Sequence, residues 1–232
     1  STLINIAGLA TGLAASLLIL LWVQNELSSE KFNSNAENIY RVEEDQFYSD
    51  RRYHVNVTPF PSGPVWKEKI PEIREQVRIN PWLPRILFRK DDKVFFESHI
   101  VAADSTIFRV FTLKMIMGDP ETALNDPNSV VLTKTLAEKY FGKDDPLGQS
   151  LTIENNLEVK VTGIINDLPN NSIFSYTAIF PYSLQPALKV PISQNWGSNS
   201  IFTYVVLEKG ADIISVNKKL TDVVLEFNPQ TT

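Results

Sequence analysis

Few residues in this 232-residue chain have the types and spacing that catalysis or metal binding requires. The two histidines, His54 and His99, lie in strand-like stretches away from any pattern typical of a nucleophile–base pair. Aspartate pairs at 91–92 and 144–145 lie in polar turns, which favours solvation over metal binding. An acidic cluster spans 37–45, but alternation along a strand would send half of its members to each face. Its members are Glu37, Glu43, Glu44 and Asp45. We therefore predict no catalytic residue and no metal site.

Motifs that bind nucleotides or hydrolyse esters and peptides are missing as well. The string closest to a Walker A loop, residues 142–150, has the wrong spacing and Gln149 where lysine is needed. There is no Gly-x-Ser-x-Gly elbow, and no His-Glu-x-x-His pair. With no cysteine, disulfides, thiol catalysis and cysteine-based zinc sites are excluded. The net charge of −5 without a basic block argues against nucleic acid as a partner. We expect a non-enzyme that binds no cofactor itself.

The elements that could position a function begin with an uncharged stretch, residues 3–23. As a helix it would be about 30 Å long, the thickness of a bilayer's hydrocarbon core. A cleaved signal peptide would have a shorter apolar core and a small-residue cleavage site, and a buried core helix is usually shorter. Trp22 at its end suits the membrane–water interface. The sequence therefore predicts a membrane span over residues 1–24.

Small residues mark one side of this span. Gly8, Gly12 and Ser16 recur every four residues, a pattern that lets another helix approach closely in the membrane. The alternative is that small residues are simply common in membrane helices. We interpret the three residues as a packing face, which a lone anchor would not need.

A stalk, residues 25–38, is predicted to follow. It is polar with sparse apolar residues such as Leu27 and Phe32, and no glycine or proline occurs between Trp22 and Thr58. The membrane helix can therefore continue beyond the bilayer before bending near residues 33–35. A continuous helix transmits displacement, whereas a glycine-rich linker would absorb it.

Beyond the stalk the pattern predicts a mixed globular domain of short strands and helices. Thr133 and Gly142 bracket the clearest helix, because they supply a cap and a stop. Asn155-Asn156 indicates a hairpin, and Asp104-Ser105 is expected to cap a short helix. The predicted strands are 39–42 extending toward 47, 54–57, 73–80, 85–90, 93–98, 129–132, 151–154, 157–165, 173–180 and 201–208, with a charged turn at 50–52 and helices at 62–69, 134–141 and 212–225.

Two tryptophans, Trp66 and Trp82, lie close to prolines. Core packing is the usual role of such residues, and a binding surface is the alternative. We retain both as candidates for a binding surface.

Several separate motifs carry a resemblance to one family. The first helix and stalk contain Asn25-Glu26-Leu27-Ser28 and Ile39-Tyr40-Arg41-Val42, and later motifs include Gly118-Asp119-Pro120, Ala137-Glu138-Lys139-Tyr140-Phe141-Gly142 and Asp145-Pro146-Leu147-Gly148. Together they resemble the first transmembrane helix and large periplasmic core domain of MacB/FtsX-like ABC transporter permeases. The similarity extends over nearly the whole chain.

The resemblance implies an α+β fold. A porter-like lobe with βαβ units would be formed by residues 39–98 and 172–232, and a sabre-like mixed lobe, residues 99–171, would be inserted in it. It also implies a permease with four membrane helices in the bacterial inner membrane, its large domain lying in the periplasm or its extracytoplasmic equivalent.

Function and partners follow from the same resemblance. Such permeases act as dimers with a cytoplasmic ABC ATPase, which holds the ATP and Mg²⁺, and a periplasmic adaptor or client protein is a further expected partner. The stalk, including Glu26, Leu27 and Phe32, would carry motion outward in mechanotransmission, coupling ATP hydrolysis to substrate export or client handling. The alternative class is a single-span anchored sensor or binding module that dimerises through Gly8 and Gly12. Nothing in the sequence names a substrate.

Overall fold

The computed structural model describes residues 2–28, 36–48, 51–168 and 175–229, with the side chains of residues 3, 24–28 and 48 left out. The first element, α1 (Thr2–Ser28), is a single helix of 27 residues. Its segment Ile4–Val23 is apolar and long enough to cross a membrane, and none of that segment is buried against the domain. The structure therefore agrees with the predicted span and continues the helix for five residues past Val23. The predicted bend at 33–35 lies outside the described residues.

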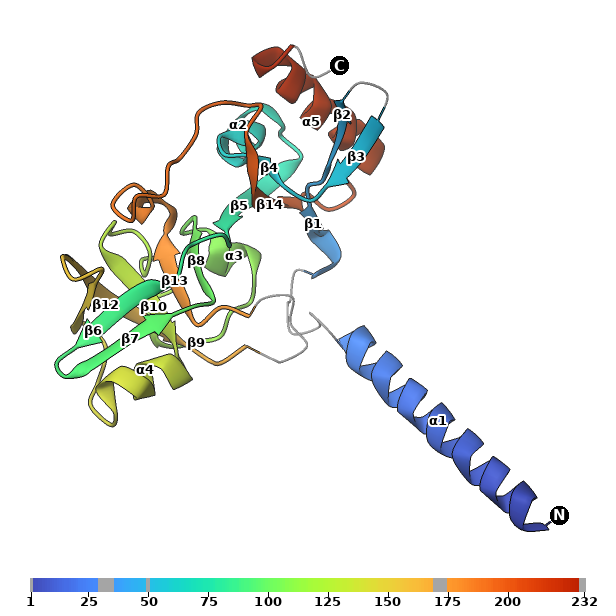
Figure 1. Ribbon diagram of the computed structural model, residues 1–232. Helices are drawn as coiled ribbons and strands as arrows, with labels where there is room; N and C mark the ends of the chain where they lie inside the picture. Colours follow the sequence, from blue (N-terminus) through green and yellow to red (C-terminus); the bar gives the residue numbers. More distant parts are fainter. Residues whose placement is uncertain (1, 29–35, 49–50, 169–174, 230–232) are drawn as a thin grey trace.

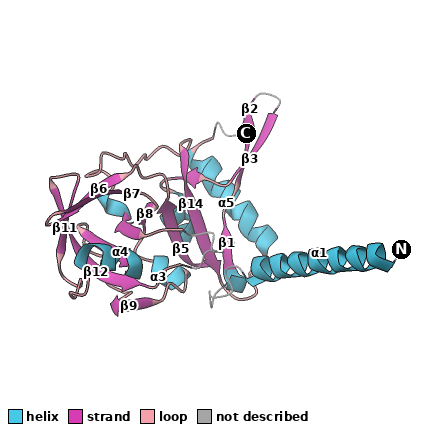
Figure 2. Cartoon of the chain, turned by 60° about the horizontal axis from the view of Figure 1, so that its bottom comes forward, coloured by secondary structure: helices cyan, strands magenta, loops and turns pink. Residues whose placement is uncertain are grey.

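Within the described residues, the domain is dominated by one sheet of twelve strands. Figures 1 and 2 show how its strands are arranged. Its main path runs β1-β14-β5-β8-β13-β10-β12-β11-β6-β7, with β4 paired to β14 and β9 paired to β12. The strands are β1 (Ile39–Arg41), β4 (Thr58–Pro59), β5 (Ile73–Asn80), β6 (Ile86–Lys90), β7 (Lys93–Glu97), β8 (Ile100–Ala103), β9 (Met115–Gly118), β10 (Ser129–Thr133), β11 (Ser150–Ile153), β12 (Leu157–Ile165), β13 (Ala178–Pro181) and β14 (Asn199–Leu207). Most pairs are antiparallel, and β8–β13 and β10–β12 are parallel.

Helices cover both faces of this sheet because its strands alternate their apolar side chains. Val130 and Leu132 of β10 pack with α4 (Lys134–Phe141) on one face, while Val131 packs with α3 (Ile107–Val110) on the other. At the β1 end, Val205 and Leu207 are covered by α2 (Ser62–Lys69) and α5 (Ile213–Phe227). Figure 1 shows α2 and α5 at one end of the sheet and α4 near the other. Short 3₁₀ turns cover Ala36–Asn38 and Tyr182–Leu184.

Local sequence signals placed several elements correctly. The helix Ser62–Lys69 and the hairpin around Asp91-Asp92 occur as predicted. Thr133 caps α4 by accepting a hydrogen bond from the Leu136 amide, and Gly142 ends it with φ 65°. The helix predicted at 212–225 is observed as Ile213–Phe227, and the side chain of Asp212 caps it by accepting a hydrogen bond from the Ile214 amide. Each of these signals acts within a few residues, which is why sequence alone suffices to find them.

The first strand is shorter than predicted. It ends at Arg41 of β1, and a separate hairpin follows, formed by β2 (Glu44–Tyr48) and β3 (Arg51–Val55). Arg51 and Arg52 therefore belong to a strand and not to a turn. The hairpin forms its own two-stranded sheet because its residues are mostly polar and offer little apolar surface to the core.

Three other predictions are corrected. The side chain of Asp104 does not cap α3; it binds Arg78 instead, and the N-cap residue Thr106 makes no side-chain cap bond. In the β11–β12 turn, positive φ falls on Glu154 and Asn155, one residue earlier than expected. The predicted strand 173–180 is described only from residue 175, and within that part β13 covers Ala178–Pro181.

The predicted lobes share the one large sheet. The β6–β7 hairpin, assigned by sequence to the first lobe, pairs with β11 of the middle range. A βαβ arrangement also occurs in that middle range, since α4 lies in the connection between the parallel strands β10 and β12. The boundaries at residues 98 and 171 stay predictions.

Candidate functional site

The small-residue face of α1 is fully exposed. The space beside Gly8 and Gly12 is open, since a Cβ added at either position would meet no atom within 4 Å. Ser16 donates a hydrogen bond to the Gly12 carbonyl, so its hydroxyl is satisfied within the helix. The arrangement suits close approach of a second helix. The packing role of these residues stays a prediction.

The stalk is described only in its first part. Glu26 and Leu27 lie in the last turn of α1, where only the backbone is described. Phe32 lies outside the described residues. The helix α1 continues without interruption to Ser28, which is compatible with a stalk that carries movement from the membrane to the domain.

The two tryptophans differ in environment. Trp66 is 2% exposed and packs in the core between α2, α5 and β14, so it offers little surface to a partner. Trp82 is 62% exposed and lies edge-on to Phe202, with ring centroids 5.9 Å apart. Of the pair, Trp82 presents the larger exposed surface to a partner.

A cleft of about 610 Å³ lies between β1, β14 and α5. Its walls combine apolar and polar surface in similar amounts, and the chain from Glu43 to Phe47 supplies charged and aromatic groups at the hairpin side. Trp66 contributes to the wall, and its buried indole N–H has no acceptor in the described part of the chain. The residues of α5 that line it include Ile213, Val216, Asn217, Leu220, Thr221 and Val224. A volume of this order suits a small ligand or a side chain of a partner.

A charged cluster borders this cleft on the hairpin. His54 Nε2 lies 2.7 Å from Glu43 Oε2, and His54 Nδ1 lies 3.0 Å from Asp45 Oδ1. The carboxylate of Asp45 also binds Arg52, and that of Glu43 binds Arg41. Because both ring nitrogens face carboxylates, the doubly protonated imidazolium fits the site best.

The pKa values reflect these contacts. The hydrogen bond to Asp45, followed by that to Glu43, raises the pKa of His54. Arg52 and then His54 lower the pKa of Asp45 to about 2. Sequence analysis expected the four acidic residues to divide equally between two faces. Glu43 and Asp45 contact His54, whereas Glu44 accepts a hydrogen bond from Asn199, and the contacts of His54 were not predicted. The available signal was two carboxylates spaced two residues apart, Glu43 and Asp45, with His54 on the following strand.

Among described residues, no group of three or more His, Cys, Asp or Glu could hold a metal ion.

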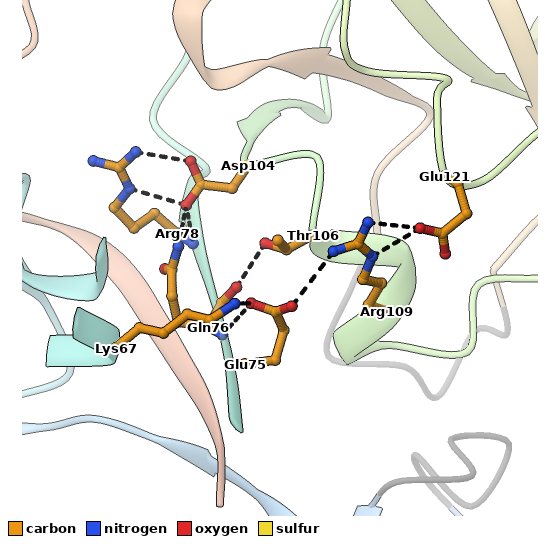
Figure 3. Close-up of polar contacts among 8 residues, drawn as sticks. All are labelled: Lys67, Glu75, Gln76, Arg78, Asp104, Thr106, Arg109 and Glu121. Carbon is orange, nitrogen blue, oxygen red and sulfur yellow. Dashed lines mark hydrogen bonds and ion pairs between the residues drawn. The ribbon is translucent and has the colours of Figure 1, made fainter. Parts of the chain in front are cut away.

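A second polar network joins β5 to β8 and α3 (Figure 3). Arg78 Nε and Nη2 donate to Asp104 Oδ2 and Oδ1 at 2.9 and 2.8 Å, and Gln76 Nε2 donates to the same carboxylate. The Arg78 guanidinium lies 4.0 Å from the ring centre of Tyr182. Burial alone would lower the pKa of Arg78, but the hydrogen bonds and charge of Asp104 outweigh it and raise that pKa. This largely buried, bidentate ion pair links β5 to the residue that follows β8.

The network continues toward the surface. Arg109 of α3 binds Glu121 and lies within 3.7 Å of Glu75 on β5. Lys67 of α2 binds Glu75 from the other side, and Thr106 donates to the Gln76 carbonyl (Figure 3). The network thereby joins α2, β5, α3 and the segment around Glu121. The network can fix geometry, and it contains no nucleophile–base pair.

The family of the chain is established by its sequence. The family described as the MacB-like periplasmic core domain matches residues 2–223. This chain belongs to that family, which forms part of ABC transporter permeases. No curated protein matches the sequence. The fold-class prediction, an α+β domain behind an apolar helix, and the sequence resemblance are confirmed.

Three solved structures share the fold. A domain of a protein assigned as a permease from Porphyromonas gingivalis has TM-score 0.71 and 20% identity, covering 84% of each chain. The periplasmic region of MacB from Actinobacillus actinomycetemcomitans has TM-score 0.60 and 16% identity, covering 87% of this chain and 91% of that one. The extracellular domain of the noncanonic ABC-type transporter YknZ from Gram-positive bacteria has TM-score 0.57 and 18% identity, covering 83% and 96%.

Proposed function

We propose that this chain is the first membrane helix and extracytoplasmic domain of an ABC permease in the bacterial inner membrane, and that it carries ATP-driven movement across the bilayer to substrate export or client handling. The observation that carries the proposal is the continuity of α1, which runs from Thr2 through the apolar segment to Ser28. A helix that continues beyond the bilayer transmits displacement along its axis, unlike a flexible linker.

The path of that movement leads to the cleft. After the stalk the chain enters β1, and β1 forms one wall of the cleft while α5 forms another. Displacement of β1 relative to α5 would change the shape of the cleft. The Arg78–Asp104 ion pair would hold β5 in place against the end of β8, so that β1 and α5 could move relative to a fixed part of the sheet.

The chain itself is proposed to be non-catalytic. A separate cytoplasmic ATPase would bind ATP and Mg²⁺, and a second permease copy would pack beside α1 through Gly8, Gly12 and Ser16. A periplasmic adaptor or client protein would contact the extracytoplasmic domain, for which exposed Trp82 is a candidate.

The test is to make the end of α1 flexible in the full-length permease with its ATPase in nanodiscs. Each glycine disfavours the helix by about 1 kcal/mol relative to alanine. Gln24→Gly combined with Ser28→Gly should therefore loosen the end of α1 and uncouple transport, while the ATPase still co-purifies. A spin label at Lys209→Cys in each copy of the dimer reports ATP-driven movement of the domain. Residues 1–232 contain no cysteine, and any cysteine elsewhere in the permease or the ATPase is replaced by serine.

The matched control is Gln24→Ala with Ser28→Ala, which changes the same side chains and keeps the helix. This variant should retain the ATP-dependent change in spin–spin distance. If the glycine pair shows the same ATP-dependent change as the alanine pair, the coupling role of this helix is refuted.

A further inference from the structure

The outer strand of the β6–β7 hairpin leaves one side of the large sheet open. β7 (Lys93–Glu97) ends the strand order, and its one strand partner in the described chain is β6. Its backbone groups that point away from β6 therefore have no ladder partner in those residues. Such an edge accepts a further strand unless it is shielded by charge, proline or a covering element.

The hairpin register shows which backbone groups point outward. Lys90 and Lys93 flank the two-residue turn and pair directly, so they form a hydrogen-bonded pair. Because this pattern alternates along an antiparallel ladder, Phe95 and Glu97 also direct their N–H and C=O toward β6. Val94 and Phe96 direct theirs to the open side.

The middle of this edge is apolar and exposed. Phe95 is 45% exposed and Phe96 is 58% exposed. Both rings are held in place, since Phe95 lies edge-on to the Tyr140 ring and Arg85 lies over Phe96. A held ring loses little conformational freedom when a partner covers it.

The residue order of β7 is self-complementary when two copies are placed antiparallel. With Phe95 opposite Phe95 of the second copy, Val94 faces Phe96, and Lys93 faces Glu97. The outward-pointing groups of Val94 and Phe96 then meet each other and complete four backbone hydrogen bonds. Apolar pairs directly opposite each other stabilise neighbouring strands. The end pair adds little, because Glu97 is buried against Lys139 and Lys93 donates to the Tyr140 carbonyl of its own copy.

We propose that β7 is a docking edge for β7 of a second copy of this chain, joining the two large sheets into one across a two-fold axis. This interface is independent of the proposed coupling role of α1. Two-fold pairing uses the same surface on both copies, as isologous interfaces do.

Shifted registers fit less well. Moving the centre by one residue toward the turn would place Lys93 opposite Phe95 and Phe96 opposite Asp92. Moving it the other way would place Phe95 opposite Glu97. Both shifts put a charged residue against an aromatic ring, so one register is favoured.

The opposite end of the sheet is less suited to such pairing. β1 has only three residues, and the last of them, Arg41, forms an ion pair with Glu43. The chain from β1 continues directly into the β2–β3 hairpin. We therefore place the interface at β7.

Disulfide trapping tests both the interface and its register, because the chain has no native cysteine. In the full chain reconstituted in lipid vesicles, Phe95→Cys alone should form a disulfide dimer on mild oxidation. Val94→Cys and Phe96→Cys should each fail alone and cross-link when mixed, since directly opposed Cα atoms lie about 4.5–5.5 Å apart and displaced ones exceed the roughly 7 Å limit for a disulfide. The mixed pair leaves Phe95 intact and so controls for loss of its packing.

A blocking variant separates this interface from contacts made by α1. Phe96→Lys places a cation at the outward edge beside Arg85 and should abolish the Phe95→Cys cross-link while the thermal unfolding midpoint stays close to that of Phe95→Cys. Equal cross-linking by all three single cysteines, or no cross-link at Phe95→Cys and none for the mixed pair, would overturn the proposal. So would a cross-link that persists unchanged with Phe96→Lys.

Discussion

Two of the hairpins in the described chain, β2–β3 and β6–β7, have the same local form and different surroundings. β2–β3 and β6–β7 each consist of two five-residue antiparallel strands. The first stands as a separate sheet whose cross-strand contacts are mainly among charged side chains, such as Asp45 with Arg52 and His54. The second is built into the large sheet, with Ile86 and Phe88 buried in the core.

The difference lies in where each hairpin's apolar side chains can go. On β6, alternation places Ile86 and Phe88 on one face, where α4 packs against them, while β11 pairs with β6 in the same sheet. On β2, Phe47 is 60% exposed, and the ion pairs around it are exposed as well. Burial contributes far more to stability than exposed ion pairs do, so the β2–β3 hairpin should open first.

The largest expected effect comes from truncating the buried aromatic of one hairpin and the exposed aromatic of the other. Phe88→Ala should lower the free energy of unfolding by about 3–5 kcal/mol, because its ring is fully buried against Phe180 and Tyr140. Phe47→Ala should change it by less than about 0.5 kcal/mol. Urea unfolding of the detergent-solubilised chain, followed by tryptophan fluorescence, measures both. Equal losses would contradict the comparison.

A smaller effect is expected from the carboxylates. Glu97 of β7 is buried and accepts hydrogen bonds from the Tyr140 hydroxyl and Lys139. Glu97→Gln removes a charged acceptor and should cost about 1–2 kcal/mol in the same urea experiment. Asp45→Asn on β2 is the matched control and should leave the global unfolding midpoint unchanged, since its contacts lie at the surface. A shift of the midpoint as large for Asp45→Asn as for Glu97→Gln would refute this distinction.

The smallest effect is a pH dependence confined to β2–β3. The neighbouring carboxylates of Asp45 and Glu43 raise the pKa of His54 above its ordinary value of 6.5. The stabilisation of the β2–β3 hairpin by protonated His54 is therefore complete below about pH 6.5, and it is lost as pH rises through the pKa of His54 in the folded state. Amide protection factors of β2 and β3, corrected for intrinsic exchange, should fall at high pH, while those of β6 stay constant.

His54→Gln provides the control for that titration, because it keeps a polar side chain and removes the ionisable ring. It should make hairpin protection independent of pH between 6 and 8, the range in which an ordinary histidine titrates. The ring proton shifts of His54 in the unmodified chain should give a pKa above 6.5. A value at or below 6.5 would show that the two carboxylates do not hold the ring.

Sequence reasoning succeeded where a few neighbouring residues decide the structure. Thr133 and Gly142 bounded α4, and Asp91-Asp92 marked the β6–β7 turn. The apolar period predicted α5, whose buried residues Val216 and Leu220 recur at helical spacing. The family motifs were also sufficient for the fold class.

Contacts between distant segments were beyond the sequence. Asp104 was expected to cap α3, but Arg78 from β5 lies close enough to bind it and removes it from that role. Trp66 was open to either a core or a surface role until α5 was seen to cover it. The charged contacts of His54 also depend on the β2–β3 register. In each case the deciding partner comes from another element, so local patterns could not identify it.

The strand order has a consequence for how the domain folds. The first strand, β1, pairs with β14, so Ile39 cannot form its strand contact until Val206, near the end of the domain, has been synthesised. Contacts between residues so far apart in the sequence form slowly, because a long loop must close before they stabilise anything. Tyr40 and Val42 would remain exposed while the intervening chain emerges across the membrane. The first strand of the domain to be synthesised is therefore among the last to gain its strand partner.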